Sequence, residues 1–126
     1  MAASLCGLLV AQRFGSLSRL FGRESLAARL VGLFHVPASA AKVGRAYLRV
    51  APLEADETRL LQLIGAAHPA WQAADAARLR RLITRRQVED FRRGRVVSVQ
   101  GWTLSSTEAR LCALAALREG AWSGNG

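Results

Sequence analysis

The chain has 126 residues, a formal net charge of +9, and a hydrophobic content of 51%, to which aromatic residues contribute little. This length fits a single domain, and the composition is typical of a chain that buries a core. A core rich in Ala and Leu favours closely packed helices over a β-sandwich. No apolar run reaches the roughly 18 residues of a membrane span, so we expect no transmembrane helix.

The first 40 residues have the composition of a targeting segment. Arginines precede a short apolar stretch at residues 30–34, and an A-x-A triplet follows at residues 38–40. A basic flank, an apolar stretch and such a triplet are the three parts of an export signal. We therefore divide the chain into a signal-like or amphipathic N-terminal segment (1–40), a single helical domain (41–119) and a disordered tail (120–126).

The same N-terminal segment has other interpretations. Leu26, Leu30, Leu33 and Phe34 recur at helical spacing, which predicts an amphipathic helix that packs on the domain. Residues 16–34 are also a candidate for peripheral contact with a membrane. Acidic residues are scarce before residue 50, where Glu24 is the only one, and this is typical of a mitochondrial transit peptide.

The first predicted helix of the domain covers about residues 42–50, because Val43, Ala46, Tyr47 and Val50 fall on one face. Pro52 ends this helix, since proline cannot continue the hydrogen-bond ladder. Acidic residues at positions 54–57 suit the positive end of the dipole of a second helix, which the glycine at position 65 ends.

A third helix is predicted from about residue 70, after a proline. Its apolar stripe stops at Ile83, because Val88 and Phe91 point the other way when each residue turns the helix by about 100°. Thr84 and Gln87 have the spacing of a capping box. We therefore expect the helix to break or change direction near Thr84, with a single long helix packed on two sides as the alternative.

A β-ribbon and a final helix are predicted at the C-terminus. Residues 95–100 are rich in β-branched side chains, Gly101 permits a turn, and residues 102–104 return as a second strand. Ser105 and Glu108 have capping-box spacing before a helix over about residues 107–118, whose small side chains allow a neighbour to approach closely. The expected fold class is mainly α, a small helical domain with a short C-terminal β-ribbon followed by a capped helix.

Arginines are concentrated between residues 78 and 95. Such a cluster is typical of a face that binds the phosphates of nucleic acid or of anionic lipid. The alternative is a solvated helix face, partly balanced by Asp75, Glu89 and Asp90, in a chain whose preference for Arg over Lys reflects a GC-rich genome. The candidate anion-binding residues are Arg78, Arg81, Arg85, Arg86, Arg92 and Arg93.

A second candidate surface lies around the ribbon. Trp102 is amphipathic and is expected beside a helix N-terminus that can receive anions, which predicts a recognition surface. The alternative is that Trp102 anchors the ribbon on the core and that Glu108 is only a helix cap. The candidate partner-binding residues are Trp102, Ser105, Glu108 and Arg110.

The sequence predicts no enzyme, no cofactor and no metal site. It contains no P-loop, no dinucleotide-binding motif and no recognisable Ser/His/Asp or Cys/His arrangement. Cys6 and Cys112 are too few for a disulfide framework or a zinc site, and His35 and His68 are isolated. We expect Cys112 to be a small, buried apolar residue.

Residues 94–117, GRVVSVQGWTLSSTEARLCALAAL, resemble the C-terminal part of a group of small uncharacterised bacterial proteins that often carry twin-arginine-type export signals. Residues 43–48, with Pro52 and Glu54, resemble the early part of the same group. Residues 22–27 resemble a twin-arginine signal in which Gly22 stands at the first arginine position. The resemblance implies a small, exported, helical accessory protein, and it supplies no catalytic residues.

Two functional hypotheses follow. The first is a non-catalytic accessory or interaction protein of the bacterial cell envelope, in the periplasm, which binds a protein partner and assists a larger exported oxidoreductase. The twin-arginine route carries folded cofactor proteins, which motivates that class of partner. The second is a cytoplasmic nucleic-acid-binding protein that uses the arginines of residues 78–95, and it predicts binding that weakens steeply with salt.

Overall fold

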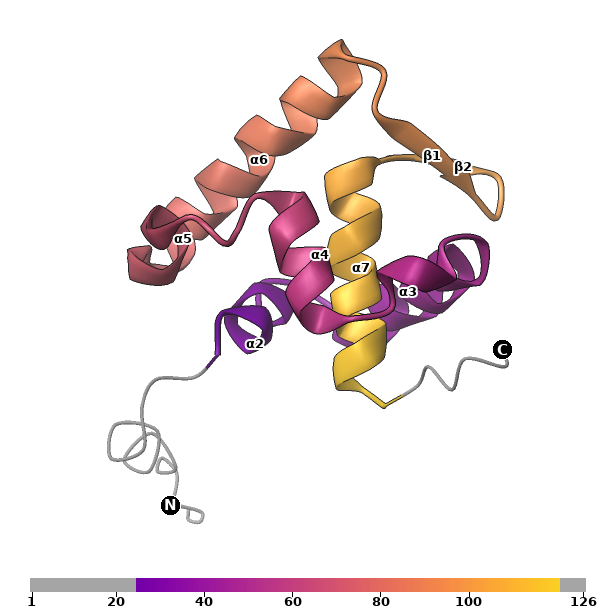
Figure 1. Cartoon of the computed structure of the whole chain (residues 1–126), viewed down its shortest axis with the longest axis horizontal. Coiled ribbons are helices and arrows are strands. Elements are labelled where there is room, and N and C mark those ends of the chain that lie inside the picture. Colours follow the sequence, from indigo (N-terminus) through magenta and orange to yellow (C-terminus); the bar gives the residue numbers. More distant parts are fainter. Residues whose placement is uncertain (1–24, 121–126) are drawn as a thin grey trace.

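The computed structural model of this chain describes residues 25–120, and Figure 1 shows how their helices and a two-stranded sheet are arranged. Cys6, residues 22–24 of the twin-arginine-like motif and tail residues 121–126 lie outside the described residues. The predicted fold class is confirmed, because the chain forms a mainly helical small domain with a two-stranded antiparallel hairpin before the final helix. The elements are α2 (Leu26–Val31), α3 (Pro37–Val50), the 3-10 helix η1 (Pro52–Glu54), α4 (Glu57–Ile64), α5 (Pro69–Ala73), α6 (Ala76–Arg92), β1 (Val96–Val99), β2 (Trp102–Ser105) and α7 (Ser106–Arg118).

Helix α7 is the centre of the fold, and α2, α3, α4 and α6 pack against it (Figure 1). Its small side chains, among them Ala109, Ala113 and Ala116, are fully buried. Helix α3 crosses α7 so closely that a Cβ atom added to Gly44 would lie 2.0 Å from the carbonyl oxygen of Cys112. The close approach predicted from the small residues of the last helix is therefore confirmed, and the crossing requires glycine at position 44.

Helix α4 begins and ends close to the predicted positions. The carboxylate of Asp56 caps its first turn by accepting a hydrogen bond from the N–H of Arg59 at 2.8 Å. Gly65 ends the helix with a φ angle of 90°, a conformation that favours glycine. Leu60 and Ile64 are fully buried where α4 packs on α7.

Residues 25–41 are part of the folded domain. The side chains of Leu26, Ala27 and Leu30 in α2 are buried in the core. Helix α3 begins at Pro37 rather than near residue 42, so the A-x-A triplet at 38–40 lies in its first turn. The three buried side chains are therefore unavailable for the membrane contact considered for residues 16–34, of which residues 16–24 lie outside the described part.

The predicted third helix is in fact two helices. Helix α5 ends where the guanidinium group of Arg29 donates hydrogen bonds to the backbone carbonyls of Gln72 and Ala74. Asp75 then caps α6 by accepting a hydrogen bond from the N–H of Arg78 at 2.8 Å. The sequence pattern missed this boundary because the donor that satisfies the end of α5 comes from a helix far earlier in the chain.

Helix α6 runs through Thr84 without interruption, so the predicted break is wrong. The alternative of a single long helix is correct, but this helix does not pack on two sides. Leu79 is buried, whereas Val88 and Phe91 are 51% and 55% exposed. Val88 and Phe91 face solvent and need no packing partner. The helix therefore continues without a break, although its apolar side chains point in a new direction after Ile83.

Strands β1 and β2 form an antiparallel hairpin in which Val99 pairs with Trp102 next to the turn. Gln100 and Gly101 form that turn with φ angles of 51° and 83°, the positive values that a two-residue type I′ turn requires. Val99 is buried, but Trp102 is 71% exposed. The interpretation of Trp102 as the core anchor is therefore wrong, and Val99 supplies the buried side chain of the hairpin.

Candidate functional site

The start of α7 is capped from within the chain. The hydroxyl oxygen of Ser105 accepts a hydrogen bond from the N–H of Glu108 at 3.0 Å, so the predicted cap at the spacing of a capping box is present. Ser105 is fully buried. It therefore acts as a helix cap and has no exposed surface with which to contact a partner.

Asp90 occupies the remainder of this helix N-terminus. Its side chain is 1% exposed, and its carboxylate accepts hydrogen bonds from the N–H of Thr107 at 2.8 Å and from Nε of Arg95 at 3.0 Å. Burial alone would raise the pKa of Asp90, but the hydrogen bonds from Thr107 and Arg95 outweigh it and hold the pKa below its ordinary value. The carboxylate of Asp90 therefore occupies the N-terminus of α7, which the sequence predicted as a site for an external anion.

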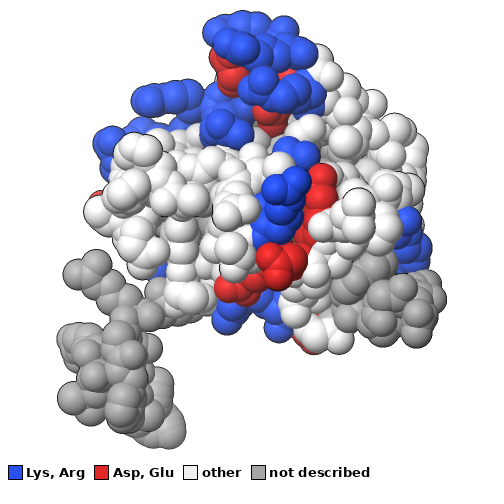
Figure 2. Space-filling view, in the orientation of Figure 1, with Lys and Arg blue, Asp and Glu red and all other residues white. Residues whose placement is uncertain are grey.

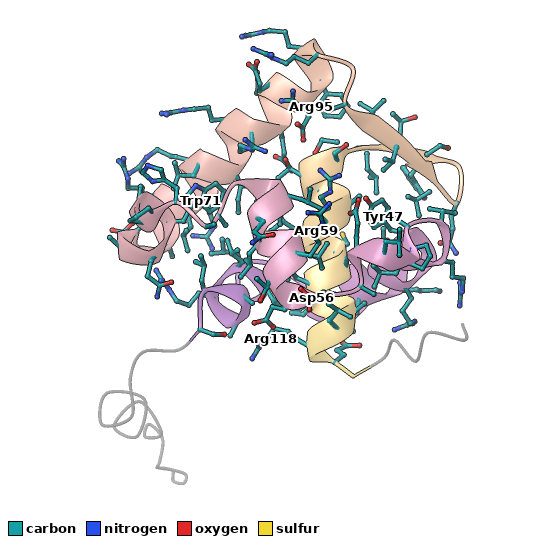
Figure 3. All side chains as sticks on the ribbon, in the orientation of Figure 1. Tyr47, Asp56, Arg59, Trp71, Arg95 and Arg118 are labelled. Atoms are coloured by element: carbon teal, nitrogen blue, oxygen red, sulfur yellow. The ribbon has the colours of Figure 1, made fainter. Side chains whose placement is uncertain are left out.

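Arg95 joins three elements at this point. Figure 3 shows it between the C-terminal end of α6 and the start of α7. Its backbone carbonyl accepts hydrogen bonds from the N–H and the hydroxyl of Ser106, at 3.0 and 3.1 Å. Asp90, Arg95 and Ser106 therefore hold the hairpin in a fixed position relative to both helices.

The hairpin passes beside the C-terminal end of α3 (Figure 1). Large apolar side chains of these two segments and of η1 are exposed to solvent: Trp102 is 71% exposed, Val50 73% and Leu53 93%. We call these three residues the hairpin-end surface. Exposed apolar side chains of this size are typical of binding surfaces for other molecules.

A partly buried group of polar side chains holds η1 in place. The hydroxyl of Tyr47 donates a hydrogen bond to Oε1 of Glu54 at 2.7 Å, and Nε of Arg110 donates to the same oxygen at 3.0 Å. Burial and the bond to Glu54 raise the pKa of Tyr47 to about 12. Burial alone would raise the pKa of Glu54, but the bonds from Arg110 and Tyr47 outweigh it and lower that pKa. Figure 3 places Tyr47 on α3 near the hairpin.

The structure separates the four candidate partner-binding residues. Trp102 is exposed at the hairpin turn, whereas Ser105 is buried and Arg110 is paired with Glu54. Glu108 lines a cavity on another side of α7. Only Trp102 therefore belongs to the hairpin-end surface. Val50 and Leu53 were not predicted as surface residues. Pro52 is the signal for them in the sequence, since a helix that ends at a proline leaves its last apolar residue beside a loop.

The six candidate anion-binding arginines also divide into groups. Figure 2 shows basic side chains along the edge of the molecule that α6 forms. The side chains of Arg78, Arg81 and Arg85 are exposed and make no hydrogen bond or ion pair with any described residue. Arg92 and Arg93 instead pair with Glu89.

Arg86 turns inward, away from the other arginines. Its guanidinium group donates a hydrogen bond to the carbonyl of Leu63 at 3.3 Å and lies against Gly65 at the end of α4. Its Nε atom is buried without a hydrogen-bond partner among the described residues. Arg86 is therefore a structural contact between α6 and α4 rather than part of the exposed arginine face.

A cavity of about 270 Å³ lies between α7, α6 and the connection from α2 to α3. Its lining is mostly apolar, and Arg80 and Glu108 are the charged residues on its wall. On the neighbouring side of Glu108, burial raises the pKa of the Cys112 thiol to about 12, with a smaller contribution from Glu108. Cys112 is buried, as predicted, and its thiol is protonated at neutral pH.

Three kinds of comparison with known proteins give no match: no family, no curated protein and no solved structure is similar to this chain. Within residues 25–120, no helix has the length and hydrophobicity needed to span a membrane. In the same residues, no three His, Cys, Asp or Glu side chains come together as metal ligands would.

Proposed function

We propose that this protein is a non-catalytic accessory protein of the bacterial cell envelope, which binds a larger exported protein through the hairpin-end surface. The observation that carries the proposal is the exposure of Trp102, which is 71% accessible on a hairpin whose position is fixed. A large aromatic side chain held on a rigid support loses little conformational entropy when it binds, and such residues dominate binding energy at interfaces.

Hydrogen bonds hold the segments of the hairpin-end surface in place, and this rigidity favours binding of a protein. Asp90 and Arg95 tie the hairpin to α6 and α7, and Tyr47 and Arg110 tie η1 to α3 and α7. Both exposed segments are therefore preorganised, which lowers the cost of ordering them in a complex.

The place in the cell envelope and the partner class rest on the sequence. The signal-like start of the chain motivates export, and the twin-arginine resemblance motivates an oxidoreductase as the larger partner. The side chains of Leu26, Ala27 and Leu30 are buried, which restricts where an export signal can be cleaved. The exported form keeps residues 25–40, because their removal would open the core.

The test is co-purification from the cell-envelope fraction of the native host. We expect the full chain to retain one specific larger protein and Trp102→Ala to lose it, with affinity falling roughly 30-fold or more, as for other interface hot spots. Val36→Ala is the control, since Val36 is also a large exposed apolar residue and lies on a different segment, outside both α6 and the hairpin. Retention of the same partner by Trp102→Ala, or no specific partner for the full chain, would contradict the proposal.

A nucleic-acid-binding protein in the cytoplasm is the second candidate, and the unpaired Arg78, Arg81 and Arg85 favour it. With Arg80, four arginines are exposed without a partner among the described residues, half of the eight between residues 78 and 95. Four contacts predict a loss of affinity of roughly 10² between about 50 and 200 mM salt. Titration of a DNA duplex at several salt concentrations measures this slope, and a flat slope would exclude the candidate.

A further inference from the structure

The first three turns of α6 carry a group of arginines without partners. The side chains of Arg78, Arg80, Arg81 and Arg85 are exposed, and none has a hydrogen bond or ion pair with a described residue. Most of the other arginines among residues 25–120 have such partners, as Arg110 has in Glu54, and Arg59 lies close enough to Glu54 to lower its pKa. A compositional preference for arginine explains the residue type, but it does not explain why four arginines without such partners follow one another along the first three turns of one helix.

This placement is unfavourable for the stability of α6. Arg78 lies in the first turn of the helix, where the helix dipole is positive and repels cations, and Arg80 and Arg81 follow in the second turn. Arg78, Arg81 and Arg85 follow one another at spacings of three and four residues, so like charges are neighbours on the surface. The arrangement is therefore explained better by a ligand that neutralises the charges than by folding.

The same side of α6 continues into apolar residues. With about 100° of turn per residue, Arg78, Arg81 and Arg85 fall within an arc of roughly 60°, and Val88 lies beside them two turns further along. Phe91 follows just under one turn after Val88, roughly 60° further round the helix from the arginines, and Phe91 and Val88 are 55% and 51% exposed. We call Arg78, Arg81, Arg85, Val88 and Phe91 the α6 face. It is about 20 Å long, at 1.5 Å per residue.

We propose that the α6 face binds the surface of an anionic lipid bilayer. The headgroup layer offers phosphates to the arginines, and the acyl boundary just below it accepts Val88 and Phe91. A single long helix with one uncovered side presents a line of side chains to a flat surface. A nucleic acid would satisfy the arginines, but it offers no apolar surface to Val88. This inference uses a different surface from the hairpin-end surface and does not depend on it.

The experiment is sedimentation of the full chain with large vesicles of phosphatidylcholine, with and without phosphatidylglycerol. We expect binding to the anionic vesicles only. The variant Arg78→Gln/Arg81→Gln/Arg85→Gln should bind on the order of 100-fold more weakly, since each basic residue near a membrane surface contributes roughly fivefold. The variant Val88→Ser/Phe91→Ser should also bind more weakly, by roughly tenfold.

The matched control is Lys42→Gln/Arg59→Gln/Arg118→Gln, which removes the same net charge from exposed positions on other elements. We expect it to weaken vesicle binding by less than about fivefold. Residues 1–24 are the same in all variants, so their own basic residues cancel in the comparison. The variant of the three α6 arginines should also unfold at or above the wild-type temperature, because it removes like-charge neighbours.

Three results would overturn the proposal. In the first, the α6 variant and the control lose vesicle binding equally, so net charge alone decides. In the second, Val88→Ser/Phe91→Ser binds vesicles as well as the wild type. In the third, the α6 face proves specific for a 20-base-pair DNA duplex and not for vesicles, which would assign it to nucleic acid.

Discussion

The buried carboxylate of Asp90 gives the sharpest test of how this fold is held together. In Asp90→Ala, the buried N–H of Thr107 loses its acceptor and the guanidinium group of Arg95 loses its carboxylate. An unsatisfied buried N–H costs roughly 1–3 kcal/mol. The pair with Arg95 adds about 1 kcal/mol at most, because Arg95 is 43% exposed and water screens it.

We therefore expect Asp90→Ala to lower the free energy of unfolding by about 1–4 kcal/mol. For a domain of this size, that corresponds to a fall of roughly 5–30 °C in the thermal midpoint. Urea denaturation followed by circular dichroism measures the free energy directly. Glu89→Ala is the matched control, because it removes the neighbouring acid, whose partners Arg92 and Arg93 are exposed, and it should leave the midpoint nearly unchanged.

The pH dependence of Asp90 follows from its lowered pKa. A carboxyl whose pKa is lower in the folded state stabilises the fold above its unfolded pKa of about 3.9, and this stabilisation is lost as pH falls through the folded pKa. The difference in stability between the wild type and Asp90→Asn should thus be full at neutral pH and shrink in acid. Equal stabilities of the wild type, Asp90→Asn and Asp90→Ala at pH 7 would refute the reasoning.

Gly44→Ala should destabilise the protein by roughly 2 kcal/mol or more, because its Cβ would clash with the carbonyl of Cys112, and an unchanged thermal midpoint would argue against that contact. Tyr47→Phe removes a hydrogen bond to charged Glu54 and should cost roughly 1–2 kcal/mol in urea denaturation. Because the pKa of Tyr47 is raised to about 12, its stabilisation is present below its unfolded pKa and is lost as pH rises through 12. A chain that begins at Ala41 lacks the buried side chains of α2 and should lose roughly 4–6 kcal/mol, so a cooperative transition equal to that of the full chain would contradict their role.

Exposed apolar residues are the part of the candidate sites that the sequence could not locate. Alternation and periodicity indicate which residues share a face, but they do not say whether a neighbour covers that face. Val88 and Phe91 were consistent with a second packed side of α6, and the structure leaves both exposed. Trp102 was consistent with a core anchor, yet Val99 is the buried residue of the hairpin.

The role of Asp90 had a signal in the sequence. Leu79, Ile83 and Asp90 lie on one side of α6, so an acid continues the apolar stripe of the helix. A carboxylate on such a stripe must find donors inside the protein, since burying it unpaired costs several kcal/mol. The donors themselves, Thr107 and Arg95, could not be identified without the structure.

The sequence by itself determined the local features of this protein. The hairpin turn at Gln100 and Gly101, the cap formed by Ser105 and the end of α4 at Gly65 all depend on residues within a few positions of one another. Backbone sterics and short-range hydrogen bonds decide such features. Only the tertiary structure decided which arginines are paired and which face solvent, and that Arg29 ends a helix 43 residues further along the chain. Those outcomes depend on partners brought together by burial of the core, which is non-directional and leaves no fixed spacing in the sequence.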